Sequence, residues 1–413
     1  MLVLYNFGIK IYYFLICIFQ FFNKKAKQWF EGRRNIFEKI SSKVDSNAGC
    51  IWFHFASLGE FEQGRPVLEE MREMYTDRKI LITFFSPSGY ELRKNYAGAD
   101  YIFYLPLDTK KNAERFINLV NPQMAIFTKY EFWYHYFNQL HSRDIPLYLI
   151  SGIFRESQPF FKWYGGLNRR ILSFVTHFFV QDKGSKELLN SIGVQNVTVS
   201  GDTRFDRVAE NASSPKQFEI VKGFCGSSNV FVAGSTWPED EKLIAELVGK
   251  YTEWKFIIAP HEIKDEKIKA LISLLPEGKA IRYSEAQTLT LAENKDQVLI
   301  IDNIGMLSSL YQYGKIAYIG GGFGVGIHNT LEAAAFGIPV IFGPNFNKFL
   351  EAKALIANGG GFTISNADQL QDVMQKMQNE TVRTTAGEAA GKYVQESKGA
   401  TEIILNYISE RNG

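Results

Sequence analysis

One stretch of the chain, at residues 316–344, combines residue types that suit a phosphate and a sugar: IAYIGGGFGVGIHNTLEAAAFGIPVIFGP. Its pattern predicts a strand, a glycine loop, a helix that begins near His328 and Asn329, and a second strand. Glycines let the backbone turn tightly and approach a ligand closely, and the loop contains Gly320, Gly321, Gly322, Gly324 and Gly326. A helix start suits a phosphate, and Glu332 could accept hydrogen bonds from ribose hydroxyls. A loop that only eases the turn is the alternative.

Other predicted strand ends in the second half of the chain could contribute to the same nucleotide site. They offer Ser235 with Thr236, Pro260 with His261, and the run Ile304, Gly305 and Met306. For His261, an ordinary surface or packed histidine is the alternative. No Gly-Lys-Ser/Thr follows the glycine loop, and the spacing is not G-x-G-x-x-G after the first strand of a dinucleotide fold. The sequence therefore disfavours ATP hydrolysis and NAD chemistry.

A carboxylate follows the first predicted strand, CIWFHFAS at residues 50–57. Glu60 stands in the first turn of the helix that comes next, where its charge is compatible with the helix dipole. A carboxylate at this place could take a proton from an attacking hydroxyl, and a purely structural role is the alternative. Equivalent strand ends in the first half of the chain carry the loop at 86–89 and the pair Glu131 and Trp133, and Arg204 could add positive charge that faces the second domain. For each of these a solvated or structural role is the alternative.

Composition and spacing argue against several classes of site. A net charge of +2 is too small for a nucleic-acid binder that relies on a large basic field. The six histidines are dispersed, and no H-E-x-x-H, D-x-D or cysteine-histidine spacing occurs, so we expect no metal site. Three scattered cysteines, Cys17, Cys50 and Cys225, fit a reducing compartment.

Residues 1–22 are almost wholly apolar and are followed by Lys24, Lys25, Lys27, Arg33 and Arg34. A spanning helix needs about 20 apolar residues, which this run just reaches with Lys10 near its middle. The charges follow the apolar run and no cleavage site appears, so the pattern favours a retained membrane anchor over a signal peptide. The basic flank places the rest of the chain in the cytoplasm. A buried core helix is the alternative.

Short apolar runs alternate with longer amphipathic segments through the remaining chain, which predicts parallel sheets covered by helices. A polar stretch at 209–217 interrupts this rhythm before it restarts. We therefore predict an α/β protein with a membrane anchor at 1–22, one Rossmann-like domain at 23–212 and a second at 213–385. Residues 386–413 are expected to form a helical segment that packs across the domains. Two such domains place their strand ends around a central cleft.

Taken in order, these segments resemble the bacterial Kdo (3-deoxy-D-manno-octulosonic acid) transferases of lipopolysaccharide assembly, which are membrane-anchored enzymes of the GT-B fold. The resemblance spans nearly the whole chain. It is carried by the anchor, HFASLGEFEQGRPVL, TFFSPSGYEL, YLPLD, Glu131 with Trp133, GDTRFD, GSTWPEDE, the APH turn and GGGFGVGIHNTLEAAAFGIPVIFGP.

The resemblance implies metal-independent, inverting transfer of Kdo from CMP-Kdo onto a lipid A precursor at the inner face of the cytoplasmic membrane. Glu60 matches the family's general base, and Glu131 and Arg204 match positions that stabilise the transition state. CMP is expected to be held by Pro260 with His261, by Ile304, Gly305 and Met306, and by Asn329, Thr330, Leu331 and Glu332.

The sequence departs from the family pattern near three of these positions. Lys129 and Tyr130 precede Glu131 where an acidic residue is usual, Arg204 replaces a lysine, and Met306 replaces a glutamate. The arginine usually found beside His261 is also absent. Two rival functions stay open: another GT-B transferase that uses a UDP-sugar and a lipid acceptor, and a non-catalytic protein that binds a nucleotide-sugar or a lipid.

Overall fold

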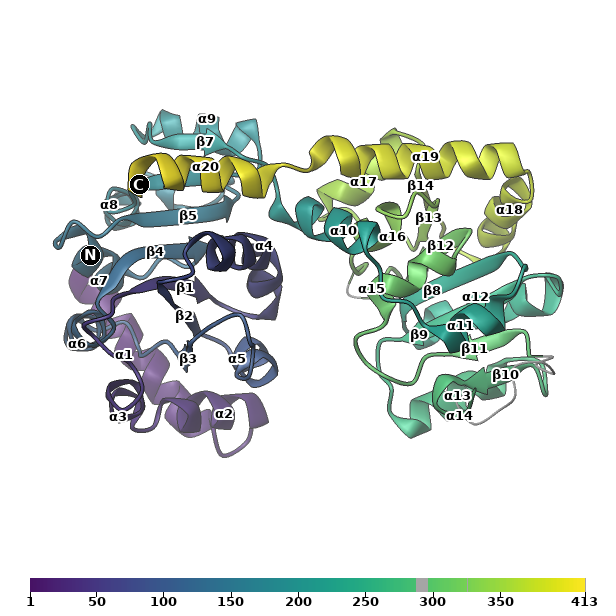
Figure 1. Ribbon diagram of the computed structural model, residues 1–413, viewed down its shortest axis with the longest axis horizontal. Coiled ribbons are helices and arrows are strands. Elements are labelled where there is room, and N and C mark those ends of the chain that lie inside the picture. Colours follow the sequence, from purple (N-terminus) through teal and green to yellow (C-terminus); the bar gives the residue numbers. More distant parts are fainter. Residues whose placement is uncertain (287–295, 325, 413) are drawn as a thin grey trace. The chain divides into compact units, whose positions relative to one another are not determined.

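The computed structural model describes residues 1–286, 296–324 and 326–412. The chain divides into two compact units, Met1–Asp206 with Gly399–Gly413 (unit 1) and Arg207–Lys398 (unit 2), which Figure 1 shows coloured along the sequence. The first crossing between units falls inside α10 (Thr203–Ser213).

Unit 1 is built on a seven-stranded sheet whose neighbouring strands all pair in parallel. The order is β3-β2-β1-β4-β5-β6-β7. The strands are β1 (Cys50–Phe55), β2 (Lys79–Phe84), β3 (Tyr101–Tyr104), β4 (Pro122–Thr128), β5 (Leu147–Gly152), β6 (His177–Val180) and β7 (Val197–Val199). The central strands are buried on both faces, as near-continuous apolar runs require. The predicted α/β class is confirmed.

Helices cover both faces of this sheet. One apolar cluster joins the sheet to α4 and α20, and the other joins it to α3, α6, α7 and α8. Since side chains alternate along a strand, Phe53 of β1 packs toward α4, whereas Trp52 packs toward α6 and α7. The helices of unit 1 are α1 (Leu2–Phe19), α2 (Lys24–Arg33), α3 (Ile36–Ser41), α4 (Leu58–Met74), α5 (Pro87–Arg93), α6 (Lys110–Val120), α7 (Tyr134–His141), α8 (Gly166–Leu172), α9 (Lys183–Ser191) and α20 (Ala400–Asn412), with a short 3-10 helix at Pro159–Phe161.

Unit 2 repeats the design with a second parallel sheet of seven strands, in the order β10-β11-β9-β8-β12-β13-β14. These are β8 (Val230–Thr236), β9 (Lys255–Pro260), β10 (Ala280–Arg282), β11 (Val298–Ile300), β12 (Ile316–Ile319), β13 (Val340–Phe342) and β14 (Gly361–Thr363). Its helices are α11 (Glu219–Cys225), α12 (Pro238–Lys250), α13 (Asp265–Leu274), α14 (Tyr283–Ala286), α15 (Leu307–Leu310), α16 (Leu331–Ala334), α17 (Leu350–Ala357), α18 (Ala367–Met377) and α19 (Glu380–Ser397), and a 3-10 helix spans Tyr311–Tyr313.

The C-terminal segment contacts both units in turn. Helix α19 packs on α16, α17 and α18 of unit 2. Gly387 lies so close to the backbone of Gly337 that a Cβ there would stand 2.2 Å from the Gly337 carbonyl oxygen. The chain then passes to α20, whose side chains Ile404, Leu405 and Ile408 join the apolar cluster around α4 in unit 1.

Helix α1 lies against unit 1 along one face. Its partly buried residues are Leu2, Tyr5, Asn6, Ile9, Tyr12, Ile16, Cys17 and Gln20, which follow helical spacing. The Tyr5 hydroxyl donates to the buried carboxylate of Asp108, and Asn6 Oδ1 lies 2.7 Å from His135 Nε2. The opposite face is exposed and largely apolar, with Val3, Leu4, Phe7, Phe14 and Phe19 more than half exposed. In the described chain, α1 is the helix long and apolar enough to cross a membrane, with a mean hydropathy of 1.8.

Candidate functional site

Glu60 lies at the carboxyl end of β1, in the first turn of α4. Ser57 is extended at the N-cap position, and its hydroxyl donates to the Glu60 carboxylate. This turn is held tightly by its neighbours, since a Cβ on Gly89 in α5 would meet the ring of Phe84 at 2.3 Å and the backbone of Ser57 at 3.1 Å. Glu60 itself is half-buried, so its carboxylate is fixed at the strand end and still reaches solvent.

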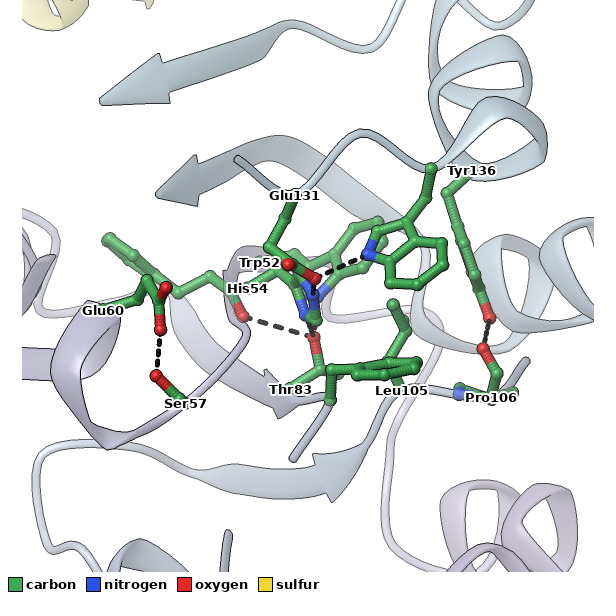
Figure 2. A network of polar contacts seen from close by, with 12 residues as sticks. Trp52, His54, Ser57, Glu60, Thr83, Leu105, Pro106, Glu131 and Tyr136 are labelled. Carbon is green, nitrogen blue, oxygen red and sulfur yellow. Dashed lines mark hydrogen bonds and ion pairs between the residues drawn. The ribbon is translucent and has the colours of Figure 1, made fainter. Parts of the chain in front are cut away.

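Glu131 follows β4, the strand that pairs with β1, and it is held by two N–H donors (Figure 2). Trp133 Nε1 donates to its Oε2 at 2.9 Å, and His54 Nε2 lies 3.2 Å from the same oxygen. A carboxylate only accepts hydrogen bonds, so Nε2 of His54 carries a hydrogen. Glu131 is therefore positioned without an arginine or lysine partner among the described residues.

His54 is fully buried in the middle of β1 and is held from its other side by Thr83 of β2. Its Nδ1 lies 2.8 Å from Thr83 Oγ1, which also accepts from Trp52 Nε1 at 2.8 Å. In the neutral imidazole with a hydrogen on Nε2, Nδ1 accepts from the Thr83 hydroxyl. These hydrogen bonds connect the buried interior of the sheet to Glu131 at the carboxyl ends of its strands.

Trp133 is in turn packed against an aromatic wall that includes α2. Its ring centroid lies 4.8 Å from that of Phe85, which contacts Trp29 of α2 at 5.9 Å. Arg33 pins this wall, because its guanidinium lies 3.8 Å from the Trp29 ring and donates to the carbonyls of Leu105 and Phe85, both at 2.8 Å. The elements after the predicted anchor thus support the residue that holds Glu131.

Arg204 is the second residue of α10 and is paired with its near neighbour Asp202. Its Nε and Nη2 both lie 2.8 Å from Asp202 Oδ2. Thr203, between them, is buried; its hydroxyl donates to the backbone carbonyl of Gln63 in α4 and lies 2.9 Å from the hydroxyl of Ser151 in β5. Arg204 is therefore anchored to the same helix that carries Glu60, and about 30% of its side chain stays exposed.

In unit 2, the glycine loop is held by a buried carboxylate on α12. Asp240 accepts from the Gly321 N–H and the Trp237 N–H, both at 2.9 Å, and from the Tyr318 hydroxyl at 2.7 Å. Burial raises the pKa of Asp240, although these donors oppose the shift. Gly320 must be glycine because a Cβ would stand 2.3 Å from the Ser235 carbonyl oxygen. Close backbone packing therefore accounts for part of the glycine pattern.

The helix after the glycine loop is shorter, and begins later, than the sequence predicted. It starts at Leu331 rather than near His328 and Asn329, and it ends at Ala334 after a single turn. The Asn329 side chain explains the late start, because its Oδ1 accepts from the Leu331 N–H at 3.1 Å while its Nδ2 donates to Glu332. One turn carries little of a helix dipole, so an anion here would depend on individual N–H groups.

His261 stands in a stack of three rings beside this loop. Its centroid lies 4.6 Å from the rings of both Trp237 and His328. Trp237 Nε1 donates to His328 Nε2 at 3.2 Å, which requires that nitrogen to be unprotonated. Burial, and then the neighbouring His261, lower the pKa of His328. The His261 side chain itself is exposed at the end of β9.

The remaining predicted nucleotide residues differ in what they expose. Ile304 and Gly305 are exposed, whereas the Met306 side chain is buried. Thr330 and Leu331 are fully buried and Glu332 is partly exposed. Ser235 adopts a positive φ of 54° near the end of β8, and Pro260 lines a small cavity of about 200 Å³ with Thr236 and Trp237. Met306, Thr330 and Leu331 can therefore offer a ligand backbone groups rather than side chains.

Sequence reasoning missed the residues that hold these sites, chiefly His54, Thr83 and Asp240. Each lies inside a predicted strand or helix, where polar residues carry no pattern of their own. Each contacts a partner far away in the sequence, such as Glu131 for His54. In the described ranges, no group of three or more His, Cys, Asp or Glu side chains is placed to hold a metal ion.

Comparison with known proteins identifies relatives over most of the chain. Residues 28–207 match the family model of 3-deoxy-D-manno-octulosonic-acid transferase (Kdo transferase). The 3-deoxy-D-manno-octulosonic acid transferase of Aquifex aeolicus is 29% identical over 345 residues, which cover 83% of this chain and 89% of that protein. That of Haemophilus influenzae is 26% identical over 388 residues, covering 89% and 90%.

A bifunctional glycosyltransferase/methyltransferase of Fusobacterium nucleatum is 25% identical over 373 residues. These residues cover 88% of this chain but 57% of that protein, so the chain spans little more than half of this relative. The methyltransferase activity in the name of that protein is therefore not inferred for this chain.

Solved structures with the same architecture include a UDP-GlcNAc 2-epimerase from Neisseria meningitidis, with a TM-score of 0.59 and 18% identity over 87% of this chain and 99% of that one. MurG of Acinetobacter baumannii aligns with a TM-score of 0.54 and 11% identity over 87% and 99%. This likeness shows the fold alone, which is the expected GT-B class. The sequence relatives support a role as a Kdo glycosyltransferase in lipopolysaccharide biosynthesis. The chain is similar to the Kdo transferases over most of its length, and its residues 28–207 match the model of that family.

Proposed function

We propose that this chain transfers Kdo from CMP-Kdo onto a lipid A precursor of the lipid IVA type, with inversion and with Glu60 as the general base. The observation that carries the proposal is the placement of Glu60 and Glu131 at the carboxyl ends of the paired strands β1 and β4. Parallel α/β sheets bind ligands at that edge. Homology to Kdo transferases then supplies the class of donor and acceptor.

In this proposal Glu60, Glu131 and Arg204 have different roles in the reaction. Glu60 accepts a hydrogen bond from the Ser57 hydroxyl and has no cationic partner among the described residues. Its carboxylate is therefore available to take the proton from the attacking hydroxyl of the lipid acceptor. As the bond to CMP breaks, the sugar becomes oxocarbenium-like and the phosphate gains negative charge. Glu131 would stabilise the positive centre and Arg204 the phosphate. Transfer without a metal ion is part of the proposal.

Unit 2 would bind the donor through the residues around its glycine loop. The exposed edge of His261, with Pro260, suits the base or ribose of CMP, and Glu332 suits ribose hydroxyls. Gly305, Met306, Asn329 and Thr330 would contribute N–H groups, since the side chains of Met306 and Thr330 are buried. Leu331 would lie beside them, because its own N–H already donates to Asn329 Oδ1. Ser235 lies at the neighbouring strand end. These contacts need no side chain at the positions that depart from the family pattern.

We also propose that the protein works at the cytoplasmic face of the inner membrane, held by α1. The exposed apolar face of α1 offers a surface that a bilayer can cover. Lys24, Lys25 and Lys27 at the start of α2 would lie near anionic headgroups. A lipid acceptor in the same membrane then reaches the enzyme by lateral diffusion.

A transfer assay with Glu60→Gln tests the assignment of the base. The assay contains purified full-length protein, CMP-Kdo generated in place and a radiolabelled tetra-acylated lipid A precursor. We expect Glu60→Gln to lower turnover by at least about 100-fold, as loss of a general base does, while CMP affinity stays unchanged. Glu73→Gln is the matched control, because Glu73 is exposed near the other end of the same helix.

The outcomes separate the alternatives. Retained turnover in Glu60→Gln would remove this residue from the base role. Tighter binding of UDP than of CMP, measured by competition, would favour a UDP-sugar transferase. Binding of CMP without formation of product would favour a protein that only binds the donor. The mass of the product would count the sugars added.

A further inference from the structure

A cavity of about 910 Å³ lies between α1, α2, α3 and the start of α6 in unit 1. Its walls include none of Glu60, Glu131 and Arg204. Helices α3 and α6 belong to the apolar cluster on one face of the sheet, whereas α4, which carries Glu60, belongs to the cluster on the other face. The cavity is therefore separate from the proposed catalytic carboxylate.

The wall of this cavity is aromatic and positively charged. Tyr13, Phe30, Phe37 and Leu107 contribute apolar surface, and Arg33, Arg34 and Arg115 stand against one acidic wall residue, Glu38. Arg33 is already occupied by backbone carbonyls. Arg34 and Arg115 are exposed and have no carboxylate within ion-pair distance among the described residues. These two guanidiniums are free to bind an anion.

The Arg115 side chain is also held in a fixed position by a neighbouring aromatic ring. Its guanidinium carbon lies 4.4 Å from the centroid of the Phe37 ring, on which it rests. A planar guanidinium fixed on a ring keeps its N–H groups directed away from the ring and can bind a phosphate through two of them. Arg34 extends from the end of α2, where the chain turns toward α3.

The cavity adjoins the part of the molecule best suited to contact a bilayer. Tyr13 on its wall belongs to α1, is 44% exposed, and packs on Phe30 of α2 with ring centroids 6.2 Å apart. Phe14, the next residue on α1, is 63% exposed and stands among the apolar side chains of the free face. A molecule with an anionic group in the cavity could thus continue along apolar surface into the lipid beside α1.

We propose that this cavity binds the headgroup phosphate of an anionic membrane glycerophospholipid, with Arg34 and Arg115 on the phosphate and the aromatic wall along the glycerol and upper acyl chain. Anionic lipids attract basic groups at the cytoplasmic leaflet, and this cavity would select them over zwitterionic lipids. The inference goes beyond the proposed transfer reaction and does not depend on it. Its role would be to seat unit 1 at a fixed depth and angle on the membrane.

Lipid retention measured by native mass spectrometry tests the proposal. The full-length protein is released from nanodiscs that contain phosphatidylcholine and phosphatidylglycerol in equal amounts, and the lipids that remain bound are counted. We expect one phosphatidylglycerol per chain. The variants Arg34→Gln and Arg115→Gln should each weaken its binding about fivefold, the effect of one basic group near an anionic surface. Arg78→Gln is the matched control, because Arg78 also rests on an aromatic ring, that of Tyr75, outside the cavity.

Each contrary outcome is distinct. Equal retention of both lipids, or unchanged retention in the double variant Arg34→Gln/Arg115→Gln, overturns the proposal. Competition by millimolar inorganic phosphate would point to a site for free anions, and stoichiometric displacement by the lipid A precursor would make the cavity an acceptor site; either result overturns the phospholipid assignment. Both arginines are exposed, so unchanged circular dichroism is expected for every variant. Transfer activity is not the readout, so failure here leaves the reaction unaffected.

Discussion

Two hydrogen bonds to one oxygen fix the orientation of the Glu131 carboxylate. Its Oε2 is committed to Trp133 and His54, while Oε1 has no protein partner in the described part of the chain. A carboxylate held by two N–H donors keeps a fixed orientation. His54 is fixed by Thr83, so the orientation of Glu131 is determined by residues buried in β1 and β2.

Removing one of these donors should slow transfer without unfolding the protein. Trp133→Phe keeps a ring against Phe85 but deletes the N–H that Glu131 Oε2 accepts. A hydrogen bond to a charged group contributes about 1.5–3 kcal/mol, so we expect kcat to fall roughly tenfold to 100-fold. The KM for CMP-Kdo should change little, because the loss concerns charge that develops in the transition state.

Trp29→Phe is a close control for this variant. Trp29 packs on the same ring, that of Phe85, but its buried Nε1 has no hydrogen-bond partner among the described residues. Its loss should leave kcat within about twofold of the unmodified protein. Equal losses in the two variants would mean that packing on Phe85, rather than the bond to Glu131, is what matters.

There is a physical reason why some residues of the candidate sites could be predicted from the sequence and others could not. Glu60, Glu131 and His261 follow apolar strands, and the carboxyl end of a parallel strand is recognisable from the pattern of the chain. His54 and Asp240 act through contacts with Glu131 and with the glycine loop, which are distant in sequence. A single sequence contains no signal for such contacts.

At the level of elements, a strand is predictable where an apolar run stands out from its surroundings. Strands of six or seven residues, such as β1, β4 and β8, form such runs, and so do the shorter β12 and β13 beside the glycine loop. The short strands β6, β7, β10 and β14 were not predicted, because three or four residues define no period of their own. Helix α16 was predicted too long since the side chain of Asn329, rather than the apolar pattern, determines where it begins.

The docking of α20 on unit 1 should depend on pH through His177. The His177 ring is buried, stacks on Tyr407 of α20 with centroids 3.9 Å apart, and bonds Thr198 Oγ1 at 2.9 Å. Burial lowers the pKa of His177 to about 4. Since the unfolded value is about 6.5, the unfolded state binds more protons between these values. The contribution of His177 to the free energy of unfolding is therefore fully present above pH 6.5 and is lost as the pH falls toward 4.

His177→Phe keeps a ring on Tyr407 but cannot take a proton. The unmodified protein should lose about 2 kcal/mol of unfolding free energy from this group between pH 7 and pH 5, and the variant should not. Urea unfolding at the two pH values measures the difference. His141→Phe, at an exposed ring on α7, is the control and should show the pH dependence of the unmodified protein. An identical dependence in His177→Phe would exclude His177 as the cause.

For the whole molecule, the two units bring different parts of the proposed reaction. Unit 1 carries Glu60, Glu131, Arg204 and the apolar helix α1, and unit 2 carries the glycine loop with its ring stack. The sequence predicted two α/β sheets because the rhythm of apolar strands restarts after the polar stretch at 209–217. How α1 meets the membrane could not be predicted, because a helix that is apolar on all sides has the same sequence pattern in either orientation.

The structure favours an in-plane orientation of α1 over a spanning one. Tyr5 and Asn6 tie its first turns to Asp108 and His135, and Tyr12 packs on Trp29 and Phe85, so one face follows unit 1 along most of its length. Its 18 residues extend about 27 Å, close to a hydrocarbon core of about 30 Å, so length alone does not distinguish the two orientations. We therefore expect α1 to immerse its free face in one leaflet and to stay docked on unit 1.

Protease protection in membrane vesicles tests this orientation. An epitope placed before Met1 and another after Gly413 should both be digested in inverted inner-membrane vesicles and both be protected in right-side-out vesicles. The reason is that α1 returns no terminus to the opposite side when it lies in one leaflet. A spanning helix would place the two epitopes on opposite sides, so that each type of vesicle protects one of them. Detergent should expose both epitopes in either type, which shows that protection comes from the membrane rather than from the fold.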